Sequence, residues 1–210
     1  MRTAAKFFHC VLRAVMLVPP LCVPSGVAAQ AAATRWEAGA GAGLAIFSSI
    51  ARRQEGASAT TLLPAHATVT GVSVSWHHQD WEVHTGLETL DAAFAVQDAA
   101  VAVLAREATM SRFRWRLLAG RTVARLGEAS VQASAGPALD VWTPSGAVAR
   151  RRVAAVGRMG LRLDAGAMSL ENSIAASVSG SPLTEAELPD GYRGKVLRTV
   201  EVGLGVRLRF

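Results

Sequence analysis

The sequence predicts an all-β protein: an eight-stranded antiparallel up-and-down transmembrane β-barrel, preceded by a cleaved signal peptide. Three observations predict it. Apolar and polar residues alternate through most of the chain after residue 34, which is the pattern of strands with two different faces. The segments between these runs alternate between long and short. The chain ends on an aromatic residue, Phe210, at the close of the clearest alternating run.

Residues 1–29 are expected to be a signal peptide, which leaves residues 30–210 as the barrel domain. Its apolar core, Ala14 to Val23, is too short to cross a bilayer as a helix. Small residues precede Gln30, where cleavage is expected. Basic residues lie near the start of this segment: Arg2, Lys6 and Arg13.

The cysteines and the net charge exclude several classes of function. Cys10 and Cys22 both lie in the expected signal peptide, so the mature chain would have no thiol, disulfide or cysteine metal site. Three of the six net positive charges also lie there, so the mature charge is +3 (6 − 3). So small a charge does not indicate a nucleic-acid partner.

Eight alternating runs give the expected strands. They lie near 35–48, 67–77, 80–90, 110–121, 127–142, 151–163, 167–178 and 196–210. One face of the last run carries Val200, Val202, Leu204, Val206, Leu208 and Phe210. The other carries Thr199, Glu201, Gly203, Gly205, Arg207 and Arg209. The Ala- and Val-rich segment 94–105 could be a further strand or a short helix. Because it has no polar alternate face, we expect it to belong to a loop at 91–109.

The lengths of the connections predict the orientation of the barrel. In chain order they are long, short, long, short, moderate, short and long, at 49–66, 78–79, 91–109, 122–126, 143–150, 164–166 and 179–195. Bacterial outer-membrane barrels have short periplasmic turns and longer external loops. The order therefore fits an even number of strands with both chain ends in the periplasm.

Alternation alone also fits a soluble barrel with its apolar face inward, but the aromatic residues favour a membrane. They are expected to form two girdles at the headgroup levels. Those assigned to the periplasmic side are Trp36, Trp76, Trp81 and Phe210. Those assigned to the external side are Phe47, Phe113, Trp115 and Trp142.

The polar faces of the strands also suit the lumen of a membrane barrel. Small residues of the first and last strands would meet where the barrel closes: Gly39, Gly41, Gly43, Gly203 and Gly205. Charged residues of opposite sign are expected to meet across the third and fourth strands: Glu82, His84 and Glu88 against Arg112, Arg114 and Arg116. Such pairs would fill an interior that is only wide enough for side chains.

The ending from Val202 to Phe210 resembles that of bacterial outer-membrane β-barrel proteins. In that family the terminal aromatic residue helps the barrel assembly machinery to recognise its substrates, which implies this role for Phe210. Length, signal peptide and loop order resemble the eight-stranded group, of the type of outer-membrane protein X and the membrane domain of outer-membrane protein A. The resemblance spans the mature chain and implies the outer membrane of a Gram-negative-type bacterium.

Two groups of polar residues contain the residue types of a metal or catalytic site. His77, His78 and His84 lie near Asp80 and Glu82, but alternation puts His77 and His78 on opposite faces. We therefore expect an interfacial histidine pair at a periplasmic turn and a hydrogen-bonding group in the lumen rather than a metal site.

A hydrolytic site that modifies lipid A would need Ser75, His84 and either Glu82 or Glu88. These side chains would lie in the lumen, away from lipid. The run Gly39 to Gly43 lacks the lysine of a phosphate-binding loop. The sequence therefore assigns no catalytic, cofactor-binding or metal-binding residue.

The external loops carry charged groups with two interpretations each. Arg150, Arg151 and Arg152 either bind lipopolysaccharide phosphates, which suit guanidinium groups, or form a solvated charge run. Acidic residues of the last loop either hold calcium weakly or accompany a turn: Glu185, Glu187 and Asp190.

The expected function is a structural role or an interaction at the cell surface. A monomeric barrel, its lumen closed by ion pairs, would contact lipopolysaccharide or another surface partner through its external loops. A narrow channel for ions or small solutes is the first alternative, and a lipid A-modifying enzyme is the second.

Overall fold

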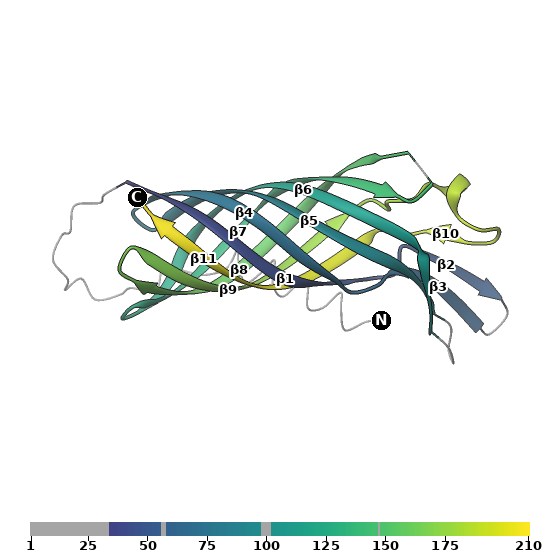
Figure 1. Cartoon of the computed structure of the whole chain (residues 1–210), viewed down its shortest axis with the longest axis horizontal. Coiled ribbons are helices and arrows are strands. Elements are labelled where there is room, and N and C mark those ends of the chain that lie inside the picture. Colours follow the sequence, from purple (N-terminus) through teal and green to yellow (C-terminus); the bar gives the residue numbers. More distant parts are fainter. Residues whose placement is uncertain (1–33, 56–57, 98–101, 147) are drawn as a thin grey trace.

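The computed structural model describes residues 34–55, 58–97, 102–146 and 148–210. The expected signal peptide, 1–29, lies outside them. Eight strands form a closed ring (Figure 1): β1 (Arg35–Phe47), β4 (Ala67–His78), β5 (Trp81–Gln97), β6 (Ala102–Leu126), β7 (Ala129–Pro144), β8 (Arg150–Ala165), β9 (Met168–Ser179) and β11 (Leu197–Arg209). All neighbours are antiparallel, and β1 pairs with β11 to close the barrel. The predicted eight-stranded fold is confirmed.

The ends of the barrel differ as the loop lengths predicted. Three two-residue turns lie at the same end as the C-terminus (Figure 1, left), and each begins with a residue of positive φ: Gln79, Gly127 and Gly166. Positive φ suits the tight primed turns of hairpins. By the rule for outer-membrane barrels, this end is periplasmic.

Further short elements build onto the opposite, external end. They are β2 (Ala51–Glu55), β3 (Ser58–Pro64), the 3-10 turn η1 (Glu185–Glu187) and β10 (Arg193–Gly194). Strands β10, β2 and β3 pair in that order and join the outer part of β5. We call these four strand segments the external sheet (Figure 1, right).

The predicted loop at 91–109 is wrong. Strand β5 continues to Gln97 and β6 begins at Ala102, and the two pair beyond the predicted strand ends. β3 pairs with the other edge of β5, so the backbone groups of β5 are hydrogen-bonded to strands on both sides. The missing polar face has a physical cause: Ala92 and Phe94 point into an apolar interior, not into a polar lumen.

The outside of the barrel is an apolar belt. Exposed apolar side chains recur on the outward face of seven strands of the ring, for example Val202, Leu204 and Val206 on β11, and the outward side chains of β7 are mostly half-buried. Trp36, Trp81, Phe113, Trp115 and Phe210 are also exposed, with exposed fractions from 44% to 74%. So continuous an apolar surface requires lipid rather than water. No helix among the described residues is long and apolar enough to cross a bilayer.

Two residues assigned to the external aromatic girdle lie inside the barrel instead. Phe47 is 5% exposed and Trp142 is 0% exposed. Their rings meet edge to face at 6.3 Å within a cluster that we call the apolar plug: Ala45, Phe47, Ile50, Ala67, Val69, Leu90, Ala92, Phe94, Met110, Trp142 and Leu197. The girdle prediction fails here because both side chains lie on the inner face of their strands, where this plug closes the external end.

Candidate functional site

Charged side chains fill the lumen between the periplasmic end and the apolar plug. Six arginines point inward: Arg112, Arg114, Arg116, Arg158, Arg162 and Arg207. Six carboxylates accompany them: Glu37, Glu82, Glu88, Asp140, Glu171 and Glu201. The formal charges of these two buried groups cancel. At the half-buried periplasmic end, Arg35 and Arg209 lie beside Glu37, and Asp164 lies beside Arg209.

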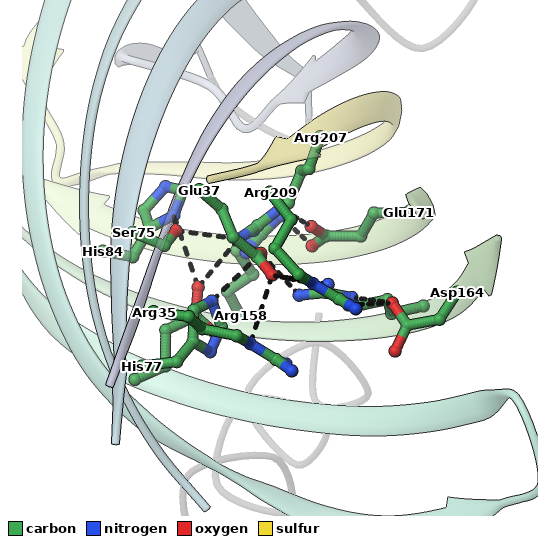
Figure 2. Close-up of polar contacts among 12 residues, drawn as sticks. Arg35, Glu37, Ser75, His77, His84, Arg158, Asp164, Glu171, Arg207 and Arg209 are labelled. Carbon is green, nitrogen blue, oxygen red and sulfur yellow. Dashed lines mark hydrogen bonds and ion pairs between the residues drawn. The ribbon is translucent and has the colours of Figure 1, made fainter. Parts of the chain in front are cut away.

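The periplasmic part of this lumen, which we call its lower part, is organised around Glu37 of β1 (Figure 2). Both guanidinium nitrogens Nη1 and Nη2 of Arg162 lie 2.6 Å from the Glu37 oxygens. His77 Nε2 lies 3.0 Å from Glu37 Oε2. Glu37 is 1% exposed. From the periplasmic end of β1, its carboxylate joins His77 of β4 and Arg162 of β8 across the lumen.

Arg207 of β11 links side chains of β4, β5 and β9 at the next level (Figure 2). Its Nη1 lies 2.9 Å from Glu82 Oε1 and donates to Ser75 Oγ at 2.8 Å. Its Nε contacts Glu171, which also pairs with Arg158. We call this set the lower network: Glu37, Ser75, His77, Glu82, Arg158, Arg162, Glu171 and Arg207.

A second ionic layer lies directly below the apolar plug. Arg114 forms a bidentate pair with Asp140, with N–O distances of 2.6 and 2.9 Å. Its Nη1 also reaches Glu201 at 3.0 Å, and Arg112 Nη2 reaches the same oxygen at 2.7 Å. The guanidinium of Arg112 stands 5.6 Å from the ring of Trp142. Arg112, Arg114, Asp140 and Glu201 form the upper network.

The predicted charge pairing between the third and fourth strands is confirmed for one pair only. Arg116 Nη1 lies 2.6 Å from Glu88 Oε1. Glu82 instead pairs with Arg207 on β11, and Arg112 and Arg114 pair with Glu201 and Asp140. The prediction considered adjacent strands, whereas long side chains in so narrow a barrel reach across it.

A cavity lies between the two networks, against the predicted glycine strip. The strip is confirmed: Gly41 of β1 faces Gly205 of β11 and Gly71 of β4. A Cβ atom on Gly43 would come within 2.5 Å of the Val202 carbonyl oxygen, so only glycine fits. The cavity has a volume of about 90 Å³, enough for several waters. Charged residues that line it are Glu88, Arg116, Arg158, Glu171, Glu201 and Arg207.

Ser75, His84 and Glu82 do come together, but their arrangement is not that of a hydrolase. Ser75 Oγ lies 3.0 Å from His84 Nδ1, and Glu82 Oε1 lies 3.6 Å from the same nitrogen. A catalytic triad uses both ring nitrogens, one toward the nucleophile and one toward the acid. Within the described residues, His84 Nε2 is buried without a hydrogen-bond partner. Ser75 also accepts from Arg207, which ties it to the lower network.

The histidines at the first periplasmic turn separate as alternation predicted. His77 points into the lumen toward Glu37. His78 points outward and stacks on Trp76, with ring centroids 5.8 Å apart. In the part of the chain that the structure describes, no three His, Cys, Asp or Glu side chains are arranged to hold a metal ion.

The external charges are partly engaged with one another. Arg150 pairs with Glu187 of η1, and Arg152 Nε donates to the Ser181 carbonyl at 2.8 Å. Hydrogen bonds from the Thr184 backbone and from Arg150 lower the pKa of the Glu187 carboxyl to about 2. Two of the three arginines proposed to bind phosphate therefore hold the last loop, while Arg151 is exposed.

Comparisons with known proteins agree with this architecture. No protein-family model and no curated protein matches the sequence. Among solved structures, Neisserial surface protein A is similar with a TM-score of 0.58 and 12% identity, over 83% of this chain and 97% of that one. The outer membrane protein OprG from Pseudomonas aeruginosa has a TM-score of 0.54 and 10% identity, over 85% and 96%. The chain thus has the fold of the small outer-membrane β-barrels, and its apolar belt matches that location.

Proposed function

We propose that this protein is a closed outer-membrane barrel that acts at the cell surface through its external sheet and last loop. The observation that carries this proposal is the filled lumen. Two ionic networks with balanced charge and an apolar plug follow one another along the barrel axis. A filled lumen disfavours solute passage, so the exposed external elements become the working part.

The external elements are built as structure rather than as open loops. β2 and β3 form a hairpin whose second strand pairs with β5, and β10 extends it. The Arg150–Glu187 ion pair ties β8 to the last loop. Ordered elements present a fixed surface, which suits contact with lipopolysaccharide or with another surface partner.

Restoring outer-membrane integrity in cells that lack the protein tests this role. One strain receives the wild type, and another receives a variant in which a short turn replaces residues 51–64. A heat-dependent shift in electrophoretic migration first confirms that both barrels fold. We expect only the wild type to reduce uptake of a hydrophobic fluorescent dye. Full restoration by the shortened barrel would contradict a role for the external sheet.

The two alternatives make different predictions for the same cells. A narrow channel would change the uptake of small solutes, whatever the external hairpin. A lipid A-modifying enzyme would change the mass spectrum of lipid A. Ser75 and Glu82 both face the same nitrogen of His84, Nδ1, which is not the arrangement of a catalytic triad. We therefore expect the mass spectrum of lipid A to be unchanged.

A further inference from the structure

A group of basic residues lies on the external sheet without a matching acid. Arg193 of β10 is directly opposite Arg52 of β2 in the antiparallel register. Side chains at such positions point to the same face, with Cβ atoms about 5 Å apart. Like charges in this arrangement repel each other and destabilise the strand pair. β10 has only two residues, so this repulsion acts on a weak pairing.

A third cation lies beside this pair. The Lys195 backbone N–H donates to the Ile50 carbonyl at 2.7 Å, which continues the pairing of β10 with β2. Partial burial and the nearby positive charge of Arg52 lower the pKa of Lys195. Three basic side chains from two segments far apart in sequence thus converge on one place.

Carboxylates near this place are directed elsewhere. Glu185 accepts a hydrogen bond from the Gly194 N–H at 3.0 Å, but it lies on the face of β10 opposite Arg193, where a Cβ of Gly194 would point. Glu187 is paired with Arg150. Throughout the described ranges, no carboxylate lies within ion-pair distance of Arg52, Arg193 or Lys195, and Arg52 Nε is buried without a hydrogen-bond partner.

The height of the group above the membrane indicates the kind of anion. Arg198 is exposed on the outer face of β11, immediately before the apolar stripe that begins at Val200. Lys195 precedes Arg198 by three residues, so the cations lie just beyond the lipid-facing surface. Basic clusters next to a membrane-spanning segment bind anionic headgroups, and guanidinium forks match the oxygens of phosphate.

We propose that Arg52, Arg193 and Lys195 form a binding site for a phosphate group of a glycolipid in the outer leaflet. The phosphate would lie between the two opposed guanidinium groups and replace their repulsion with two charge-assisted contacts. This inference rests on the proposed surface role and names a ligand class for it. Bound lipid would also hold β10 on β2 and so order the external sheet.

Binding of lipid A to the purified, folded barrel in detergent micelles tests the site. The probes are diphosphorylated lipid A and the same lipid with its phosphates removed. The variants are Arg52→Gln with Arg193→Gln, and Arg121→Gln as a control that removes an exposed arginine at the opposite, periplasmic end. We expect the double variant to bind phosphorylated lipid A at least tenfold more weakly, and the control to bind within twofold of wild type.

Equal binding of the two lipids by the wild type would overturn the proposal, as would unchanged binding by the double variant. Competition by inorganic phosphate against phosphorylated lipid A would support recognition of the phosphate group itself. The dye-uptake assay separates this inference from the surface role. If the double variant restores the barrier but does not lose lipid A binding, the site is wrong and the external sheet acts otherwise.

Discussion

Charged side chains fill the periplasmic and middle parts of the lumen, whereas apolar side chains fill its external end. In the charged part, Arg114 satisfies two carboxylates from two other strands. In the apolar plug, Phe47 and Trp142 fill space by ring packing. The charged part needs each partner to be present, because a buried ion that has lost its partner is costly. The plug depends only on volume, and it tolerates small changes.

The largest expected effect is the loss of one central arginine. Arg114→Met leaves Asp140 without its bidentate partner and Glu201 with Arg112 alone. We expect the free energy of unfolding to fall by about 3–5 kcal/mol, measured by urea titration in lipid vesicles. Adding Asp140→Asn should recover much of that loss. A single variant as stable as the wild type would contradict the importance of pairing.

A small loss of side-chain volume in the apolar plug should lower the free energy of unfolding by less than the loss of Arg114 does. Ile50 is fully buried there, and Ile50→Val removes one methylene group. We expect a loss of about 1 kcal/mol in the same titration. Val148 is 77% exposed at the same end, so Val148→Ala serves as the control and should change stability by less than about 0.5 kcal/mol. Equal losses for both variants would show that the plug is not tightly packed.

A substitution in a periplasmic turn, outside both regions, should raise the stability of the barrel slightly. Gln79 has a φ of 56°, where a side chain is strained and glycine is not. Gln79→Gly should stabilise the barrel by about 0.5 kcal/mol after the added freedom of the unfolded chain is counted. Gly127→Ala, at the equivalent turn with a φ of 62°, should destabilise it. The opposite signs would be measured in the same urea titrations.

The smallest expected effect is local and depends on pH. The pKa of Glu187 is lowered to about 2 by its hydrogen bonds with Thr184 and Arg150, so the ionised carboxylate stabilises the last loop. This contribution is complete above about pH 4.5, the ordinary value for a glutamate, and is lost as the pH falls toward 2. Limited proteolysis with an acid-active protease should cut the loop faster below pH 4. Glu187→Gln should remove that dependence, and a loop equally resistant at pH 3 and 6 would contradict it.

The comparison also explains what the sequence predicted well. Alternation of apolar and polar residues along β11, and the glycines of β1 opposite it, follow from each strand having one lipid face and one lumen face. The same rule correctly placed His77 and His78 on opposite faces of their strand. These features depend on the chain locally, so a single sequence contains them.

The apolar plug was missed because it breaks that rule. At the external end of β5, residues 92–96 are apolar on both faces, so alternation no longer marks a strand there. Alternation therefore predicts a loop at Phe94, and the position of Trp142 near a strand end predicts a place in the aromatic girdle. The sequence alone also does not predict which ions pair. Arg207 and Glu82 lie far apart in the sequence and on strands that are not neighbours, and they meet only because the barrel closes.

Single-channel conductance in planar bilayers tests most directly whether two independent barriers close the lumen. Four barrels are compared after each is shown to fold by its heat-dependent migration. They are the wild type, a plug variant (Phe47→Ala with Trp142→Ala), an ionic variant that removes one ion pair from each network (Arg207→Ala with Glu82→Ala, and Arg114→Ala with Asp140→Ala), and the combination of all six changes. We expect steady current steps from the combined variant alone. Steady steps from the wild type, from the plug variant or from the ionic variant would contradict the account.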